Sequence, residues 1–203
     1  MSSDLNIAIL IPAAGVSKRL GSPKQLLKWG DSTLMGHVIK TTKQLDSHQV
    51  LVVLGAHYDK ILKEISNADV KIIQNKNWER GLGSSIAAGA QFLLDSKNNI
   101  DALLVVLVDQ PLISTAYLEA MIADFNTDEG RIIATSYGDD TYGVPALFDK
   151  KYLAQLAKLS DDKGAKMLIM NNLDSVSAVD MVPILTDIDT KEDYNKICET
   201  TRQ

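Results

Sequence analysis

Short apolar runs alternate along this chain with segments whose apolar residues recur at helical spacing. Six runs are predicted to form buried strands, at residues 7–11, 50–54, 70–73, 102–108, 131–137 and 144–148. Helices are predicted at residues 34–45, 58–65, 86–94, 118–125, 150–159, 163–171 and 191–199, with Asp31 and Ser32 able to cap the first. Because such alternation builds βαβ units, we expect a three-layer αβα fold of the α/β class with a mostly parallel sheet.

The size and composition are those of one globular domain over residues 1–203. Hydrophobic residues make up 45% of the chain, and no apolar run approaches the ~20 residues of a membrane span. A net charge of −5 argues against a nucleic-acid partner, for which a basic surface is expected. The single cysteine excludes an internal disulfide, and no basic segment typical of a signal peptide opens the sequence. We therefore expect a cytoplasmic protein without membrane contacts.

The stretch after the first predicted strand combines small residues with cations. Residues 12–24 read PAAGVSKRLGSPK, so that Lys18, Arg19 and Lys24 place three positive charges within seven positions. Small residues let an anionic ligand approach the backbone, and open α/β sheets bind ligands at the carboxyl ends of their strands. The stretch is therefore predicted to bind a polyphosphate, and the alternative is an exposed basic turn.

Two common nucleotide-binding motifs are excluded in this stretch. A Walker A loop has four residues between its first glycine and a Gly-Lys pair, whereas five separate Gly15 from Gly21 and Ser22 follows. The G-x-G-x-x-G fingerprint fails because Gly15 has no glycine two residues later. This argues against a plain dinucleotide-binding oxidoreductase.

A second candidate segment, residues 80–85, directly precedes a predicted helix. Its sequence, RGLGSS, contains Gly81, which permits close approach of a ligand to the backbone. Ser84 and Ser85 follow, and each hydroxyl can either donate to a ligand or cap the helix.

Acidic residues mark two further segment ends. Asp109 ends the most apolar run, where a carboxylate is a suitable oxygen ligand for Mg²⁺ or a cap for the next turn. Asp187 and Asp189 precede the last predicted helix, which Asp189 or Thr190 can cap with Asp193 in its first turn.

The loop resembles the signature of the MobA/MocA-like nucleotidyltransferases, which is roughly A-A-G-x-S-x-R-M-G-x-x-K. This chain departs from that pattern only at Leu20, which replaces the methionine. MocA is the cytidylyltransferase that matures molybdopterin, and MobA is its guanylyl counterpart. The guanylyl branch usually has Gly-Gly where this chain has Ala13 and Ala14, so the resemblance favours the cytidylyl branch. It also implies a Rossmann-like fold of the nucleotide-diphospho-sugar-transferase type.

Later segments resemble motifs of the same family in the same order. Residues 81–86 are similar to G-L-x-x-S-L, a loop over the nucleobase and ribose. Residues 109–111 resemble D-x-P, whose aspartate holds the catalytic metal, and residues 187–193 resemble D-I-D-T-P-E-D, which supplies a second ligand. Asp187 and Asp189 both fit that second role, and we favour Asp189. Residues 142–148 and 161–166 resemble two acceptor-side motifs, G-x-P-x-x-F and G-D-x-G-A-R.

The resemblance thus implies a Mg²⁺-dependent transfer of CMP from CTP to the phosphate of molybdopterin. The catalytic residues implied are Arg19, Lys24 and Asp109, and the metal ligands are Asp109 and Asp189. The nucleotide-binding residues implied are Ala13, Ala14, Gly15, Ser17, Arg19, Lys24, Gly81, Ser84 and Ser85. The acceptor-binding residues implied are Gln110, Pro111, Tyr142, Gly143 and Pro145.

Two alternatives stay open at this point. The acceptor can instead be a sugar or polyol phosphate, because Asp161 and Lys166 depart from the acceptor motif and residues 12–15 also resemble the cytidylyltransferase of isoprenoid synthesis. The chain can also be a non-catalytic carrier that hands a nucleotide or finished cofactor to a partner enzyme. A molybdoenzyme or a chaperone is the partner that the family resemblance suggests.

Overall fold

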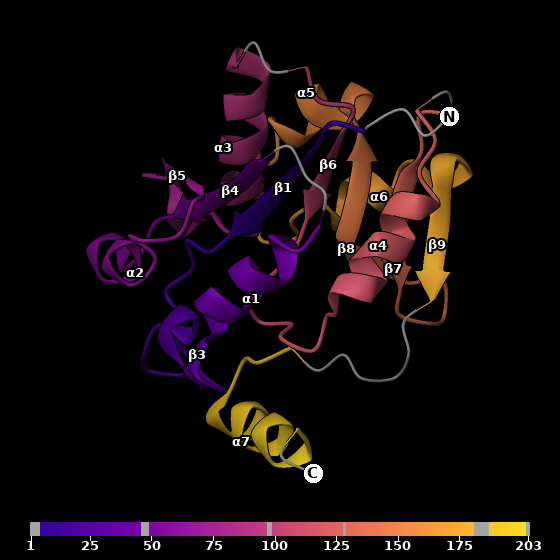
Figure 1. Cartoon of the computed structure of the whole chain (residues 1–203). Coiled ribbons are helices and arrows are strands. Elements are labelled where there is room, and N and C mark those ends of the chain that lie inside the picture. Colours follow the sequence, from indigo (N-terminus) through magenta and orange to yellow (C-terminus); the bar gives the residue numbers. More distant parts are fainter. Residues whose placement is uncertain (1–4, 46–48, 97–98, 128, 181–186, 202–203) are drawn as a thin grey trace.

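A computed structural model describes residues 5–45, 49–96, 99–127, 129–180 and 187–201 (Figure 1). These residues contain a seven-stranded sheet in the order β5-β4-β1-β6-β8-β7-β9 and a small hairpin of β2 and β3. The strands are β1 (Ile7–Pro12), β2 (Lys28–Trp29), β3 (Ser32–Thr33), β4 (Gln49–Leu54), β5 (Lys71–Gln74), β6 (Ala102–Val105), β7 (Ile132–Ser136), β8 (Tyr142–Asp149) and β9 (Val176–Asp180). The expected α/β fold is confirmed.

Helices cover both faces of the sheet, as Figure 1 shows. Residues of α1 (Leu34–Thr42), α2 (Tyr58–Glu64) and α4 (Thr115–Ala123) share one core cluster with the odd-numbered residues of β1. Residues of α3 (Leu82–Asp95), α5 (Leu153–Leu156) and α6 (Lys166–Met170) share the other cluster with Ala8 and Leu10. The last helix, α7 (Lys191–Thr200), reaches the first cluster through Ile197. The predicted three layers are therefore present.

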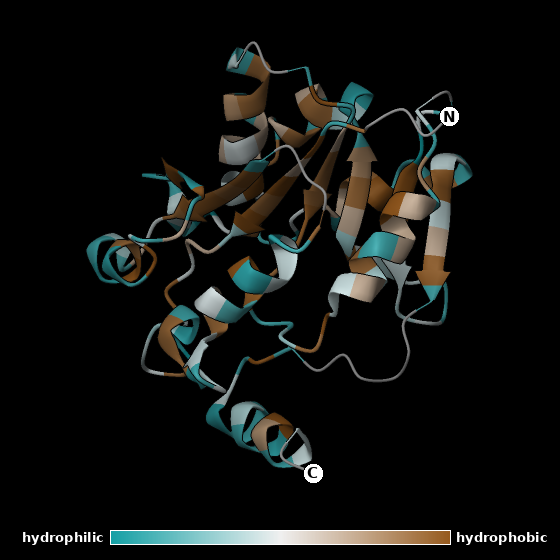
Figure 2. Cartoon of the chain, viewed as in Figure 1, coloured by the Kyte–Doolittle hydropathy of each residue, from teal (hydrophilic) through white to brown (hydrophobic). Residues whose placement is uncertain are grey.

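The central strand β1 is buried along its whole length, which explains its continuous apolar sequence. Figure 2 shows the same pattern in the neighbouring strands, which are brown, while teal residues lie on the outer sides of the helices. On one face, α3 packs so closely that a Cβ added to Gly89 would lie 2.3 Å from Leu10 Cδ1. A side chain at Gly89 would therefore push this helix away from the sheet.

Strand direction determines where a ligand site can form. β5, β4, β1 and β6 are parallel, so their carboxyl ends meet at one edge of the sheet. β8 is antiparallel to both β6 and β7, and β9 pairs with β7 in parallel. The segments after β1, β5 and β6 are therefore brought to a common edge, as expected for an open α/β sheet.

Several predicted boundaries are corrected. β6 ends at Val105 rather than at residue 108, because its next partner on β8 in register is Pro145, which has no N–H to donate. The helix predicted at residues 150–159 is a 3₁₀ turn, Lys150–Tyr152, followed by the short α5. The first helix is capped by Thr33, whose hydroxyl accepts from Gly36 N, rather than by Asp31 or Ser32. The strand β9 was not predicted.

No helix within the described ranges is both long enough and apolar enough to span a bilayer.

Candidate nucleotide and metal site

The loop after β1 runs beside the end of β4 and closes on itself. Ala13 N donates to Val53 O at 2.8 Å, and Ala56 N donates to Ala14 O at 2.9 Å. Ser17 has a left-handed backbone with φ of 56°, and its Oγ accepts from Lys24 N at 3.0 Å. The loop therefore turns back at Ser17 and presents Lys24 at the edge of the sheet.

The buried Gln25 side chain fixes this loop through hydrogen bonds to its backbone, a role that was not predicted from the sequence. The residue is only 2% exposed, and its Nε2 donates to Ala13 O at 2.8 Å and to Gly15 O at 3.2 Å. Two loop carbonyls are thereby turned toward the protein and away from an anionic ligand. The only local signal in the sequence is a polar residue placed between Lys24 and the apolar pair Leu26 and Leu27.

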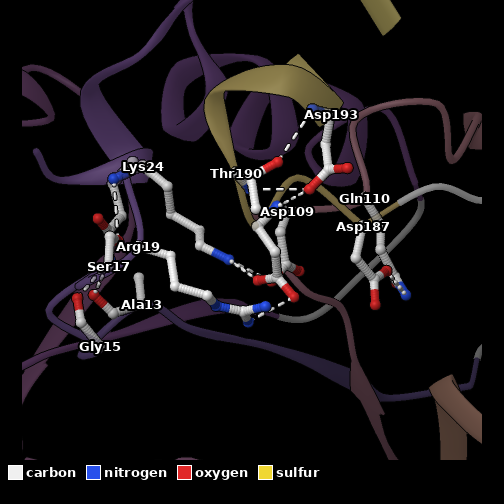
Figure 3. A network of polar contacts seen from close by, with 12 residues as sticks. Ala13, Gly15, Ser17, Arg19, Lys24, Asp109, Gln110, Asp187, Thr190 and Asp193 are labelled. Atoms are coloured by element: carbon white, nitrogen blue, oxygen red, sulfur yellow. Dashed lines mark hydrogen bonds and ion pairs between the residues drawn. The ribbon is translucent and has the colours of Figure 1, made fainter. Parts of the chain in front are cut away.

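Two carboxylates from distant parts of the chain converge on the Lys24 ammonium (Figure 3). Lys24 Nζ lies 2.8 Å from Asp109 Oδ2 and 3.0 Å from Asp189 Oδ1, although 85 and 165 residues separate these partners in sequence. Arg19 Nη2 lies 2.7 Å from Asp189 Oδ2. Asp109 follows β6 and Asp189 lies just before α7, so the fold itself assembles the cluster.

The charges in this cluster stabilise one another. Burial acts to lower the pKa of Lys24, but the Asp109 and Asp189 carboxylates outweigh it, so the pKa of Lys24 is raised. Burial acts to raise the pKa of Asp189, and the Lys24 and Arg19 cations reverse this, so the pKa of Asp189 is lowered. Lys24 is therefore charged and Asp189 is ionised at neutral pH.

The donor set fits a hard divalent cation. Asp109 Oδ1 is buried and has no hydrogen-bond partner among the described residues. Asp109 and Asp189 already place oxygens around a single positive atom, the Lys24 nitrogen. No group of three or more His, Cys, Asp or Glu side chains that could hold a metal occurs in the described part of the chain. Two carboxylates completed by substrate phosphate oxygens match the way in which proteins bind Mg²⁺.

Asp187, the alternative second ligand, faces a different group of residues. Its Oδ1 accepts from Gln110 Nε2 at 3.0 Å, and the same nitrogen donates to Tyr137 Oη at 3.0 Å. Partial desolvation and the nearby Asp109 and Asp189 carboxylates raise the pKa of Asp187. Burial raises the pKa of Tyr137 to about 12, so its hydroxyl stays protonated and donates to Val144 O. This arrangement supports Asp189 over Asp187 as the partner of Asp109.

A cavity of about 770 Å³ joins these groups. Ten predicted site residues line it, namely Ala13, Ala14, Gly15, Ser17, Arg19, Lys24, Gly81, Ser85, Asp109 and Asp189. Polar and aromatic residues that were not assigned to nucleotide binding also line it, among them Gln25, Trp78, Glu79 and Asp162. The cavity lies at the carboxyl ends of the parallel strands and falls in the size range of small-molecule sites.

Ser84, predicted to contact the nucleotide, is not among the residues that line this cavity. It is buried, and its Oγ lies 2.8 Å from Gly81 O and 3.1 Å from Asn77 O, while Asn75 Nδ2 donates to it at 2.9 Å. Ser84 therefore shapes the start of α3 from within. The sequence alone does not distinguish the roles of Ser84 and Ser85, because both directly follow Gly81 and Gly83.

The predicted acceptor residues lie outside the cavity lining. Gln110 is 2% exposed and binds Asp187, and Pro111 O accepts from His37 Nε2 at 2.9 Å. Pro145 is buried in β8, where its carbonyl accepts from Thr135 Oγ1 at 2.7 Å. Tyr142 and Gly143 are half-buried on the same strand, beside Tyr137. Their binding of an acceptor stays a prediction.

The segment at residues 161–166, which resembles an acceptor-side motif, packs on the start of α3. Asp161 O accepts from Gly83 N at 2.7 Å, and Asp162 lines the cavity. A Cβ added to Gly81 would lie 1.9 Å from Asp162 Oδ1, and Gly81 itself has φ of +92°. Only glycine fits at this contact, which explains the glycine in the RGLGSS segment.

The sequence profile of the MobA-like NTP transferase domain matches residues 9–176, which include the loop, the start of α3 and Asp109. The chain belongs to this family. The resemblance of its first loop to the family signature is thereby confirmed. As a MobA-like protein, it is an enzyme of the nucleotidyltransferase type.

Relatives of this MobA-like protein carry different names. Nicotine blue oxidoreductase of Paenarthrobacter nicotinovorans is 31% identical over 195 residues, which cover 91% of this chain and 93% of the relative. The bifunctional protein GlmU of Pseudomonas fluorescens is 25% identical over 171 residues, which cover 83% of this chain but 36% of GlmU. The names of these relatives thus indicate different reactions, and the match spans about a third of the length of GlmU.

Solved structures agree with the fold of the MobA-like protein. Rv0371c from Mycobacterium tuberculosis H37Rv superposes with a TM-score of 0.81 at 28% identity, covering 97% of this chain and 99% of the other. A second structure of Rv0371c, described as a complex with manganese, has a TM-score of 0.78 at 25% identity and covers 96% of this chain and 99% of the other.

Proposed function

We propose that this protein transfers CMP from CTP to a phosphorylated acceptor, with the phosphate of molybdopterin as the preferred acceptor and pyrophosphate as the second product. The observation that carries the proposal is the convergence of Asp109, Lys24 and Asp189 beneath a cation-bearing loop, within one cavity. Cations for a triphosphate and oxygens for its metal are thus available within a few ångströms.

The reaction places few demands on proton transfer. The second pKa of a phosphate monoester lies near ~6, so the acceptor is largely ionised at neutral pH and needs no general base. Catalysis then depends on alignment and on positive charge near the transferred phosphoryl group. Arg19 and Lys24 supply that charge, and Lys24 exchanges its carboxylate partners for triphosphate oxygens as the substrate enters.

Asp109 and Asp189 would hold the metal, which we propose to be Mg²⁺. The unpartnered Asp109 Oδ1 supports this assignment, and so does the manganese complex of the similar Rv0371c. A bound divalent cation would stabilise charge on the α-phosphoryl group and fix the position of the triphosphate.

The identities of the nucleotide and of the acceptor are the most specific elements of the proposal. Ala13 and Ala14, in place of the Gly-Gly pair of the guanylyl branch, support CTP. The acceptor rests on the family resemblance, and a sugar or polyol phosphate is the alternative that the departures at Asp161 and Lys166 favour.

A second candidate function is supported by the nicotine blue oxidoreductase relative. In this case the cavity would bind the diphosphate of a redox nucleotide, and no pyrophosphate would be released. Oxidation of NADH or NADPH by the purified protein with a quinone-type acceptor dye would favour this candidate, and its absence would count against it.

The experiment that tests the proposal measures pyrophosphate release. The protein is incubated with Mg²⁺, each of CTP, GTP, ATP and UTP, and a panel containing molybdopterin and sugar and polyol phosphates. Release that requires both CTP and molybdopterin, and that falls by ~10²–10³ in Asp109→Asn, supports the proposal. Nucleotide binding without release from any pair would contradict it and would indicate the carrier.

A further inference from the structure

The order of strands determines the two ends of the nucleotide cavity. β1 lies between β4 and β6, with β5 beyond β4. Asp109 follows β6 on one side of the β1 loop, whereas Trp78, Gly81 and Leu82 follow β5 on the other side. A triphosphate held by Lys24 beside Asp109 therefore directs its nucleoside toward the β5 side.

Asp162 is a carboxylate at that nucleoside end. Close packing on Gly81 places Asp162 Oδ1 against the Cα of the loop, and the neighbouring Asp161 O accepts from Gly83 N at 2.7 Å. The Asp162 carboxylate makes no hydrogen bond or ion pair with any residue that the structure describes, and it lines the cavity. Asp162 is thus an exposed acceptor that is held against Gly81 and has no partner among the described residues.

Ser85 lines the same end and complements this acceptor. Its Oγ accepts from Asn75 Nδ2 at 3.1 Å, which leaves the hydroxyl hydrogen to donate elsewhere. Glu79 also lines the cavity, and both Glu79 and Asp162 are exposed, but only Asp162 is held by a close contact with a glycine, Gly81. Asp162 is therefore the better placed of the two carboxylates to contact a base.

We infer that Asp162 is the residue that reads the nucleobase and that it selects bases with an exocyclic amino group, taking cytosine and rejecting uracil. The amino group of cytosine donates hydrogen bonds, which a carboxylate accepts. Uracil has a carbonyl oxygen at the same ring position, and two acceptors facing each other repel. This inference rests on the proposed function, because it requires a nucleoside triphosphate in the cavity.

The test compares Asp162→Asn with Asp161→Asn in the 203-residue chain. Both variants remove one negative charge from adjacent positions, but Asp161 is not among the residues that line the cavity. Dissociation constants for CTP, UTP and inorganic triphosphate are measured by calorimetry with Mg²⁺. Because hydrogen bonds to charged groups are strong, the parent protein is expected to bind CTP about 10- to 100-fold more tightly than UTP.

In Asp162→Asn the preference for CTP should fall to roughly threefold or less, because an amide can donate to uracil as well as accept from cytosine. Asp161→Asn should keep the parental preference, and both variants should bind inorganic triphosphate as well as the parent does. An unchanged preference in Asp162→Asn overturns the inference while nucleotide transfer stands. A parent protein that binds none of the nucleotides overturns the inference and the proposed function together.

Discussion

Replacing Lys24 with methionine should separate its role in holding two carboxylates from its role in the reaction. The Lys24 ammonium contacts Asp109 and Asp189 at 2.8 and 3.0 Å, and its side chain is 16% exposed. Methionine keeps the apolar part of the side chain but leaves the two acids facing each other without a cation. The cluster should then lose stability and, at the same time, become a better site for a divalent cation.

The magnitude follows from the burial of the pair. Breaking a fully buried ion pair costs about 3–5 kcal/mol, and an exposed one costs less than about 1 kcal/mol. With Asp109 21% and Asp189 36% exposed, we expect Lys24→Met to lower the free energy of unfolding by about 1–3 kcal/mol. For a domain of this size, that corresponds to a fall in Tm of roughly 2–10 °C.

The assay is thermal unfolding in EDTA and in increasing MnCl₂, without nucleotide. Manganese at about 100 times its Kd adds about 2.7 kcal/mol, so it should restore the Tm of Lys24→Met to the parental value or above. The Tm of the parent should rise less on adding manganese, because the Lys24 ammonium must leave the carboxylates before the metal can bind. Lys18→Met is the matched control, since Lys18 lines the cavity but forms no ion pair with a described carboxylate. If Lys24→Met is as stable as the parent in EDTA and manganese shifts both equally, the reasoning is refuted.

Three further predictions concern residues that support the site. Gln25→Met should weaken CTP binding about tenfold in calorimetry, because the carbonyls of Ala13 and Gly15 lose their hydrogen-bond donor. An unchanged affinity for CTP would show that Gln25 does not hold the loop in its binding conformation. Thr190→Ala should lower the free energy of unfolding in urea by about 1 kcal/mol through loss of the α7 cap, and an equally stable variant would contradict this. Hydrogen bonds from the side chain and backbone of Thr190 lower the pKa of Asp193. The contribution of Asp193 to the free energy of unfolding is therefore fully present above its ordinary pKa of 3.8 and is lost as the pH falls through the lowered pKa. Asp193→Asn should therefore show a smaller loss of stability in acid than the parent, and an identical acid profile would argue against the cap.

Much of the fold could be predicted because its signals are local. The apolar runs of β1 and β4 are continuous, and the apolar residues of α1 recur at helical spacing, so the sequence alone indicates the type of these elements. The strand β9 was missed because it lies at the sheet edge, where Val176–Asp180 is only half-buried and mixes polar with apolar residues. Its place in the sheet depends on pairing with β7, which no short stretch of sequence reveals.

Some residues of the candidate site could likewise be predicted from local sequence, and others could not. Lys24, Asp109 and Asp189 could be selected because each lies in a motif or at a strand or helix end, where charged groups of parallel sheets gather. Gln25 could not, because its function consists of two hydrogen bonds to backbone carbonyls. The contact of Asp162 with Gly81 could not be predicted either, because it joins residues 81 positions apart in sequence.

The most direct test of the central claim is a crystal structure with Mn²⁺ and the α,β-methylene analogue of CTP, which cannot release pyrophosphate. The account predicts an anomalous manganese peak within about 2.5 Å of both the Asp109 and Asp189 carboxylates, with Lys24 moved onto the phosphates. Manganese bound away from Asp109, or a triphosphate outside the loop at residues 13–24, would contradict it.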